Sequence, residues 1–264
     1  MDTYNSGIFG EIQMPESFVE LMEFPTQLSK IKGKNIMLWR GQGDISWPID
    51  SGAYRRLVNS GQEQNELYLS SYEKGMLKSA RHKGYGTNEG LPISDMELLA
   101  KLQHHGAATR LVDFSKSMLV ALWFCLNSNI DNTGLITGVH TYSLGGLNYE
   151  GYLEKRDYKG IMKELSTEDL PVFMEPPVVS KRIAAQHAVF LYSGISNEVT
   201  GSLILPKDKG GTLFIAISPE LKKEAKKILI ESFDIRTETL FPDFDGFASL
   251  VNNISSDIKS NNRW

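Results

Sequence analysis

The sequence predicts an α+β protein: a single mixed domain with a central, largely antiparallel sheet flanked by helices. Two kinds of segment intermingle along the chain, short apolar or alternating runs and longer stretches with helical periodicity. The runs typical of strands are residues 35–41, 133–143, 188–192, 202–205 and 211–217. The stretches typical of helices are residues 15–24, 67–83, 94–102, 118–126 and 218–229. No repeat or linker interrupts them, which favours one domain.

Composition narrows the class of protein. The 264 residues are 41% hydrophobic and 23% charged, with a net charge of -4, as in an ordinary globular protein. The negative net charge argues against broad electrostatic binding to nucleic acid or an anionic membrane, but it does not exclude a local basic patch. No window approaches the ~18 apolar residues of a spanning helix, and the N-terminus lacks signal-peptide features. We therefore expect a cytoplasmic protein without a membrane partner.

The predicted helices have recognisable starts and faces. Ser94 to Glu97 forms a capping box, and Ser218 with Pro219 opens another helix. In the latter we expect a buried apolar stripe opposite four solvated lysines, which are Lys222, Lys223, Lys226 and Lys227. In the helix at 67–83 the expected core residues are Leu67, Tyr68, Tyr72, Met76, Leu77 and Ala80. Residues 144–170 are weakly patterned, and we expect one short helix within them.

The single cysteine excludes an internal disulfide and a multi-cysteine zinc site. Cys125 lies in the apolar run Trp123-Phe124-Cys125-Leu126. That setting favours a buried, inert thiol over a nucleophile.

One polar stretch lies between two apolar helical segments. It runs Gln103-His104-His105-Gly106-Ala107-Ala108-Thr109-Arg110-Leu111-Val112-Asp113-Phe114. Polar groups between core elements are costly unless they pair, bind or react. A second polar cluster, Trp39-Arg40-Gly41-Gln42, ends an apolar strand much earlier. We expect the two to meet and form a site.

These motifs resemble the FRG domain, a bacterial family named for a Phe-Arg-Gly motif. The resemblance rests on Arg40-Gly41-Gln42 with Trp47, on residues 103–114, and on Ala121-Leu122-Trp123-Phe124. Later segments, Arg182 to Phe190 and Leu240 to Asp243, are also similar. Trp39 replaces the usual Phe, and Ala188 stands where family members carry Gly. The resemblance implies an FRG domain at 31–255 after an N-terminal helical extension at 1–30.

A more distant resemblance is to the ADP-ribosyltransferase fold, which implies a sheet that can be split. In those enzymes an Arg or His ends the first core strand, a strand-to-helix segment with Ser, Thr or Tyr follows, and a late strand begins with Glu. Here Arg40, Thr109 to Ser117, and Gln186 match these positions. A Gln cannot carry the charge of the catalytic Glu. Either another carboxylate, Asp113 or Glu238, replaces it, or the fold is kept without the chemistry.

The resemblance implies NAD as a substrate, and no metal is expected because the histidines come without clustered Cys or Glu. Cleavage of the nicotinamide–ribose bond of NAD passes through a positively charged sugar, so the site needs a phosphate ligand and an electron-rich group. Guanidinium suits the first task, and Asp113 suits the second. The expected catalytic residues are Arg40, Asp113 and Gln186. The expected NAD-binding residues are Arg40, Gly41, Gln42, His104, Thr109, Arg110 and Arg182.

Structural roles compete with several of these assignments. Asp113 forms a structural ion pair with Arg110 or Arg40 in an equally good interpretation. Gly41 relieves backbone strain and Gln42 satisfies buried backbone in another. Adjacent histidines point to different helix faces, so a shared metal is not expected, and one of them suits a helix C-cap.

The predicted function is an ADP-ribosyltransferase-like enzyme that modifies a macromolecule (RNA, DNA or protein) as a bacterial toxin or antiphage effector. An antitoxin or chaperone would be its partner. The alternative is a non-catalytic recognition module that binds a nucleotide, nucleic acid or protein in the same cleft.

Overall fold

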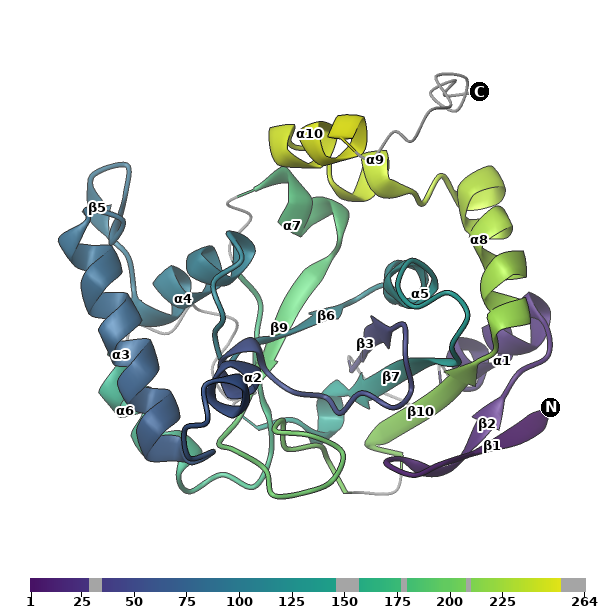
Figure 1. Cartoon of the computed structure of the whole chain (residues 1–264), viewed down its shortest axis with the longest axis horizontal. Coiled ribbons are helices and arrows are strands. Elements are labelled where there is room, and N and C mark those ends of the chain that lie inside the picture. Colours follow the sequence, from purple (N-terminus) through teal and green to yellow (C-terminus); the bar gives the residue numbers. More distant parts are fainter. Residues whose placement is uncertain (29–34, 146–156, 177–179, 208–209, 253–264) are drawn as a thin grey trace.

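A computed structural model describes residues 1–28, 35–145, 157–176, 180–207 and 210–252. Its centre is an eight-stranded sheet in the order β1-β2-β10-β7-β3-β6-β9-β8 (Figure 1). All its pairings are antiparallel except that of β10 with β2, so the predicted α+β class with a largely antiparallel sheet is confirmed. The strands are β1 (Asp2–Ser6), β2 (Gly10–Met14), β3 (Met37–Gln42), β6 (Val112–Ser115), β7 (Gly134–His140), β8 (Val172–Met174), β9 (Ala188–Tyr192) and β10 (Thr212–Ile217). A separate small hairpin pairs β4 (Thr87–Asn88) with β5 (Leu91–Pro92).

Two groups of three helices pack against this sheet (Figure 1). The first packs on β3, β7 and β10 and comprises α1 (Phe18–Leu28), α5 (Met118–Leu126) and α8 (Pro219–Phe233). The second lies beside β6, β8 and β9 and comprises α3 (Glu66–His82), α4 (Asp95–His104) and α6 (Tyr158–Leu165). The remaining helices are α2 (Gly52–Asn59), α7 (Lys181–Ala185), α9 (Thr237–Leu240), α10 (Phe244–Asn252) and the 3-10 helix η1 (Thr141–Ser143).

Side-chain caps fix the predicted helix starts. The Ser94 hydroxyl accepts a hydrogen bond from the amide of Glu97, and the Ser218 hydroxyl accepts one from Leu221. Ser51 caps α2 in the same way through the amide of Tyr54. A serine hydroxyl replaces the missing intrahelical partner of the first turn. The chain thus enters α2, α4 and α8 in a defined direction.

The N-terminal segment contains more than the predicted helical extension. Residues 1–30 include the β1–β2 hairpin as well as α1, and Gln13 of β2 pairs with Ile215 of β10. The hairpin is therefore part of the central sheet. The boundary at residue 30 stays a prediction, and residue 255 lies outside the described residues, as do residues 146–156 of the weakly patterned stretch.

Three local expectations are wrong. Residues 202–205 form no strand but only a single bridge between Leu203 and Ile195, because their amides bond the loop before α2 instead (Ser202 to the Asp50 carboxylate, Leu203 to the Ile49 carbonyl). Lys222 is fully buried rather than solvated. The expected core of α3 is wrong in part: Leu77 and Ala80 are buried as predicted, but Leu67 and Tyr68 are exposed, and Leu69, Ser70 and Glu73 are buried instead.

Lys222 is buried because its ammonium meets backbone carbonyls. Its Nζ donates to the carbonyls of Gly43 at 2.7 Å, Asn129 at 2.9 Å and Ser128 at 3.4 Å. Two of these carbonyls follow the C-terminus of α5, where a cation is favoured. Lys222 therefore fixes the loop after β3 to the end of α5.

Cys125 has the predicted inert environment. Its side chain is fully buried in the core beneath α8. Burial raises the pKa of the thiol to about 12, so it stays protonated at neutral pH. Within the described ranges, no helix combines the length and apolar character needed to cross a membrane.

Candidate functional site

The sheet is almost interrupted between β3 and β6. The two strands pair through one residue pair, Trp39 with Ser115, whereas β3 pairs with β7 along its whole length. Where the strands separate, Arg40 Nη1 donates to the main-chain carbonyl of Asp113 at 2.9 Å. A side chain from one strand thus replaces a ladder hydrogen bond with the other. Arg40 and Asp113 are brought together, as predicted from the sequence.

Gly41 and Gln42, next to Arg40, have packing partners. A Cβ at Gly41 would lie 1.8 Å from the Ala121 carbonyl oxygen, so α5 packs directly on the strand backbone. Gln42 is buried, and its amide donates to the carbonyls of Trp47 and of Asp44. Both contacts stabilise the surroundings of Arg40. A role for either residue in NAD binding stays a prediction.

The Asp113 carboxylate is held by a short chain of polar side chains. Thr109 Oγ1 donates to Gln103 Oε1 at 2.8 Å, and Gln103 Nε2 donates to Asp113 Oδ2 at 2.9 Å. Because the threonine hydroxyl bonds the amide oxygen, the amide NH2 group faces the carboxylate. Thr109 is itself fully buried. It orients Gln103, and Gln103 orients Asp113.

The Asp113 carboxyl is exposed to solvent on one side. Burial by the protein atoms around it raises the pKa of the carboxyl above its ordinary value, and Arg40, Gln103 and Arg55 oppose that rise. The carboxylate is therefore held by its neighbours and is still accessible to water.

Two arginines face this carboxylate. Burial lowers the pKa of Arg40, with Asp113 opposing and Arg55 adding to the effect. The Nε of Arg40 is buried and has no hydrogen-bond partner in the part of the chain that the structure describes. Arg55 comes from α2, and its Nη1 donates to the Asp50 carbonyl at 2.6 Å. We call Arg40, Arg55, Gln103 and Asp113 the cleft group.

A cavity of about 460 Å³ adjoins the cleft group. It is lined by Gly52, Arg55, Arg56, Asn59, Gln103, Gly106, Ala107 and Ala108. Its walls are therefore α2 and the turn after α4. Gly106 has a φ of +85°, a conformation that glycine adopts without strain. The turn directs the chain from α4 into β6, which carries Asp113.

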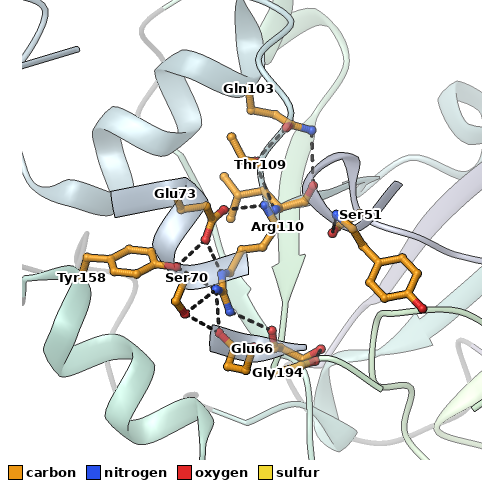
Figure 2. Close-up of polar contacts among 12 residues, drawn as sticks. Ser51, Glu66, Ser70, Glu73, Gln103, Thr109, Arg110, Tyr158 and Gly194 are labelled. Carbon is orange, nitrogen blue, oxygen red and sulfur yellow. Dashed lines mark hydrogen bonds and ion pairs between the residues drawn. The ribbon is translucent and has the colours of Figure 1, made fainter. Parts of the chain in front are cut away.

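Arg110, only three residues before Asp113, lies among Glu66, Ser70, Glu73 and Tyr158 (Figure 2). It is 3% exposed, and its Nε donates to Glu73 Oε2 at 2.6 Å. Its Nη2 donates to Glu66 at 2.8 Å and to the Tyr158 hydroxyl at 2.7 Å, and its own amide donates to Glu73 Oε1 at 2.6 Å. Arg110 therefore connects β6 to α3 and α6. Its guanidinium contacts do not include the cleft group.

Charge complementarity makes this arrangement stable. Burial alone would lower the pKa of Arg110, but Glu73, Tyr158 and Glu66 outweigh burial and raise it. Burial raises the pKa of Tyr158, as does Glu73. The predicted structural ion pair of Arg110 exists with Glu73 rather than with Asp113. We call Ser70, Glu73, Arg110 and Tyr158 the buried network; Glu66 lies half-buried at its edge, and its Oε2 has no partner among the described residues.

The remaining predicted residues gather beneath α9 and α10. Gln186 Nε2 donates to the Leu240 carbonyl at 3.0 Å. Arg182 pairs with Asp243 at 2.7 Å, and its guanidinium lies 4.9 Å from the centre of the Phe241 ring. Burial lowers the pKa of His104, and Arg182 adds to that effect. The group is joined to β6 because Ser115 Oγ donates to the Gln186 carbonyl at 2.7 Å.

The two histidines lie side by side at the end of α4, with their ring centres 5.1 Å apart. His104 ends α4, and His105 is its C-cap, whose amide donates to carbonyls of the last turn. The prediction of one histidine cap is confirmed. Among the described residues, no group of three or more His, Cys, Asp or Glu side chains could hold a metal ion.

Two residues of these arrangements do not follow from the motifs of the sequence. Arg55 of the cleft group follows the Ser51 cap by one helical turn. Glu73 of the buried network lies at helical spacing from Leu69 and Leu77. A charged residue on the apolar stripe of a helix was the available signal.

Comparisons with known proteins identify one domain. Residues 35–133 match the sequence model of the FRG domain, so the chain contains an FRG domain. The match includes Arg40, Gln103 and Asp113 and ends before Arg182 and Gln186. No curated protein and no solved structure gives a significant match.

Proposed function

We propose that the chain is an ADP-ribosyltransferase-like enzyme, which cleaves NAD at the cleft group and transfers ADP-ribose to a macromolecule. The observation that carries this proposal is the Asp113 carboxylate, which is solvent-exposed, held through one oxygen by Gln103, and faced by Arg40 and Arg55. An oriented anion beside two cations suits a ligand with a cationic reacting sugar and an anionic pyrophosphate.

The reaction assigns a distinct task to Asp113. The bond between ribose C1′ and the nicotinamide nitrogen breaks, and its electron pair leaves with neutral nicotinamide. Positive charge develops on the ribose, which a carboxylate stabilises. A nucleophilic oxygen or nitrogen of the acceptor then bonds to C1′, and its proton passes to the Asp113 carboxylate. Because burial raises the pKa of that carboxyl, it is a better base than an ordinary aspartate.

The arginines have the complementary task. Guanidinium binds phosphate oxygens through paired N–H groups. The half-buried Arg40 guanidinium lies beside Asp113, with Nη1 on the Asp113 carbonyl, and Arg55 lines the adjoining cavity. The pyrophosphate would bridge these two side chains and leave the ribose beside Asp113. The nearly interrupted pairing of β3 with β6 also suits the split sheet that the resemblance implies.

Gln186 supports the alternative. It stands where the resemblance expects a catalytic Glu, and its amide is engaged with the Leu240 carbonyl. A cleft that lacks this carboxylate can recognise a nucleotide without cleaving it. The second candidate function is therefore a non-catalytic module that binds the same ligand. The toxin or antiphage role predicted from the resemblance requires transfer and belongs to the first candidate alone.

The two functions are separated by adding NAD labelled in its adenylate half, with and without cell lysate, to the purified chain. We expect nicotinamide release and label on a macromolecular fraction. Asp113→Asn should lower both by at least about 100-fold, as for loss of a catalytic base, with a melting temperature within about 4 °C of wild type. Glu238→Gln tests the other proposed carboxylate, and the exposed Glu231→Gln is the matched control.

Two results would contradict these assignments. If the wild-type chain releases no nicotinamide under either condition, the enzyme proposal is wrong. Binding of ADP-ribose that is lost in Arg40→Ala would then support the recognition module. If Glu238→Gln rather than Asp113→Asn abolishes release, the reaction occurs but its carboxylate is misassigned.

A further inference from the structure

Two cavities lie on either side of α2 and share one residue. The first, of about 460 Å³, includes Gln103 of the cleft group. The second, of about 520 Å³, lies between α2 and α3 and includes Tyr68 and Tyr72. Arg56 lines both. We call the two cavities together the α2 groove; it includes Arg55 and Gln103 of the cleft group and extends to Tyr68 and Tyr72 of α3.

The charge of the α2 groove contrasts with that of the chain. The whole protein carries 32 acidic and 28 basic residues, yet no Asp or Glu is among the residues that line either cavity in the described structure. Arg55 and Arg56 are both exposed there. The other polar groups of the lining are uncharged serines, glutamines and an asparagine. The groove is thus locally positive on an acidic protein, which favours an anionic ligand.

Aromatic faces add a second feature. Tyr68 is 39% exposed on the first turns of α3. The Arg56 guanidinium lies 5.5 Å from the centre of the Tyr72 ring. Tyrosines beside arginines form the combination that binds unpaired bases and their phosphates, because every base has a face that stacks and a phosphate that pairs. The bases of a duplex keep their faces stacked on one another and would leave these tyrosines unused.

We infer that the α2 groove binds single-stranded nucleic acid and presents it to the cleft group as the acceptor of ADP-ribose. Arg56, which lies over the Tyr72 ring, contacts phosphates, and the exposed Tyr68 stacks on a base, whereas Arg55 stays with the NAD pyrophosphate. The strand reaches the reacting centre at Gln103, which bonds the Asp113 carboxylate. The role as acceptor rests on the proposed function, but binding itself needs no NAD.

The test is fluorescence anisotropy of the full chain with labelled single strands of about 12 nucleotides, one of DNA and one of RNA, and with a duplex of the same sequence. We expect the single strands to bind more tightly than the duplex. Tyr68→Ala should weaken binding at least about fivefold, as for loss of one stacked base. Arg56→Ala should reduce the slope of log affinity against log salt by about 0.7.

Matched variants lie outside the groove. Tyr142 is 73% exposed on η1, and Lys227 is exposed on α8, so Tyr142→Ala and Lys227→Ala should leave binding unchanged. Because NAD is absent, the result stands whether or not the chain cleaves NAD.

Three results would overturn the inference. One is no binding of either single strand, and another is equal losses in the groove variants and their controls. The third is binding of ADP-ribose, but not of the strands, that is weakened by Tyr68→Ala. That outcome would assign the groove to the adenosine end of the dinucleotide.

Discussion

The buried network and the cleft group are both built from arginine and carboxylate, yet they are in opposite states. In the buried network, Arg110 and Glu73 are removed from solvent, and both Glu73 oxygens accept hydrogen bonds from Arg110. In the cleft group, Arg40 keeps an Nε–H with no partner among the described residues, and Asp113 is exposed. The two arrangements are carried by the same short stretch of chain, on residues 110 and 113.

This difference separates stability from function in physical terms. A buried charge is tolerated when its partner and hydrogen bonds are complete, and removal of one partner is then costly. A group left incompletely paired beside solvent contributes little to folding, but it is ready for a ligand. We therefore expect the buried network to hold α3 and α6 against the sheet and the cleft group to bind. Measurements of the free energy of unfolding test that distinction.

The largest effect should follow from Glu73→Ala. The substitution removes the acceptor of Arg110 Nε and of the Arg110 amide and leaves a buried guanidinium with an incomplete set of partners. We expect the free energy of unfolding to fall by about 3–5 kcal/mol, measured by urea denaturation. Glu63 is exposed ahead of α3, so Glu63→Ala should change it by less than about 0.5 kcal/mol. Similar small effects of both variants would show that the buried network does not hold the fold.

Gly41→Ala should have the next largest effect, although it adjoins Arg40. The added Cβ would meet the backbone of α5 at the Ala121 carbonyl, 1.8 Å away, and backbone cannot rotate aside. Overpacking of this kind costs about 1–3 kcal/mol. Gly75 is the matched control, since a Cβ there has nothing within 4 Å. In mid-helix, Gly75→Ala should stabilise the protein by about 0.5–1 kcal/mol. A harmless Gly41→Ala would mean that α5 is not fixed against β3.

Sequence patterns predicted the elements better than the orientation of their faces. The strands at β3, β7, β9 and β10 and the capped starts of α4 and α8 follow from local signals. In α3 the apolar residues Leu67, Tyr68, Tyr72 and Met76 predicted a buried stripe, but Leu67 is 76% exposed and the real stripe contains Glu73. The prediction for these residues is wrong because Tyr68, Tyr72 and Met76 line the open cavity between α2 and α3.

The candidate site was predictable only in part, because the sequence shows charged residues but not their partners. Arg40 and Asp113 were found because each ends or begins an apolar segment with a charge, which is visible in the sequence. Arg110 carries the same signal, and only the partner distinguishes it, since Glu73 lies 37 residues away. Lys222 shows the same limit: it was assigned to a solvated face, and its three carbonyl partners lie on loops far along the chain. Whether a charged side chain is buried depends on a partner that is distant in the sequence, and the local periodicity of the sequence does not show that partner.

Asp113→Asn should give the smallest change in stability and the clearest contrast with Glu73→Ala. Asparagine keeps an oxygen that accepts from Gln103, so we expect a change below about 1 kcal/mol at neutral pH. Burial raises the pKa of Asp113 in the folded state. The folded protein therefore binds this proton more tightly than the unfolded chain, and wild-type stability gains from the group as pH falls through the folded pKa towards about 4. Asp113→Asn should remove that gain.

Asp44 is a control whose contribution to stability should depend on pH in the opposite direction. Burial would raise its pKa, but hydrogen bonds from Ser46, Asn132 and Asn129 outweigh burial and lower the pKa to about 2 from 3.8. Its contribution is present above the ordinary pKa and is lost as pH falls towards about 2, so Asp44→Asn should flatten the acid side of the curve. Urea denaturation at successive pH values measures both variants. If Asp113→Asn instead lost several kcal/mol at every pH, Asp113 would be a structural carboxylate like Glu73, and the distinction between the two regions would fail.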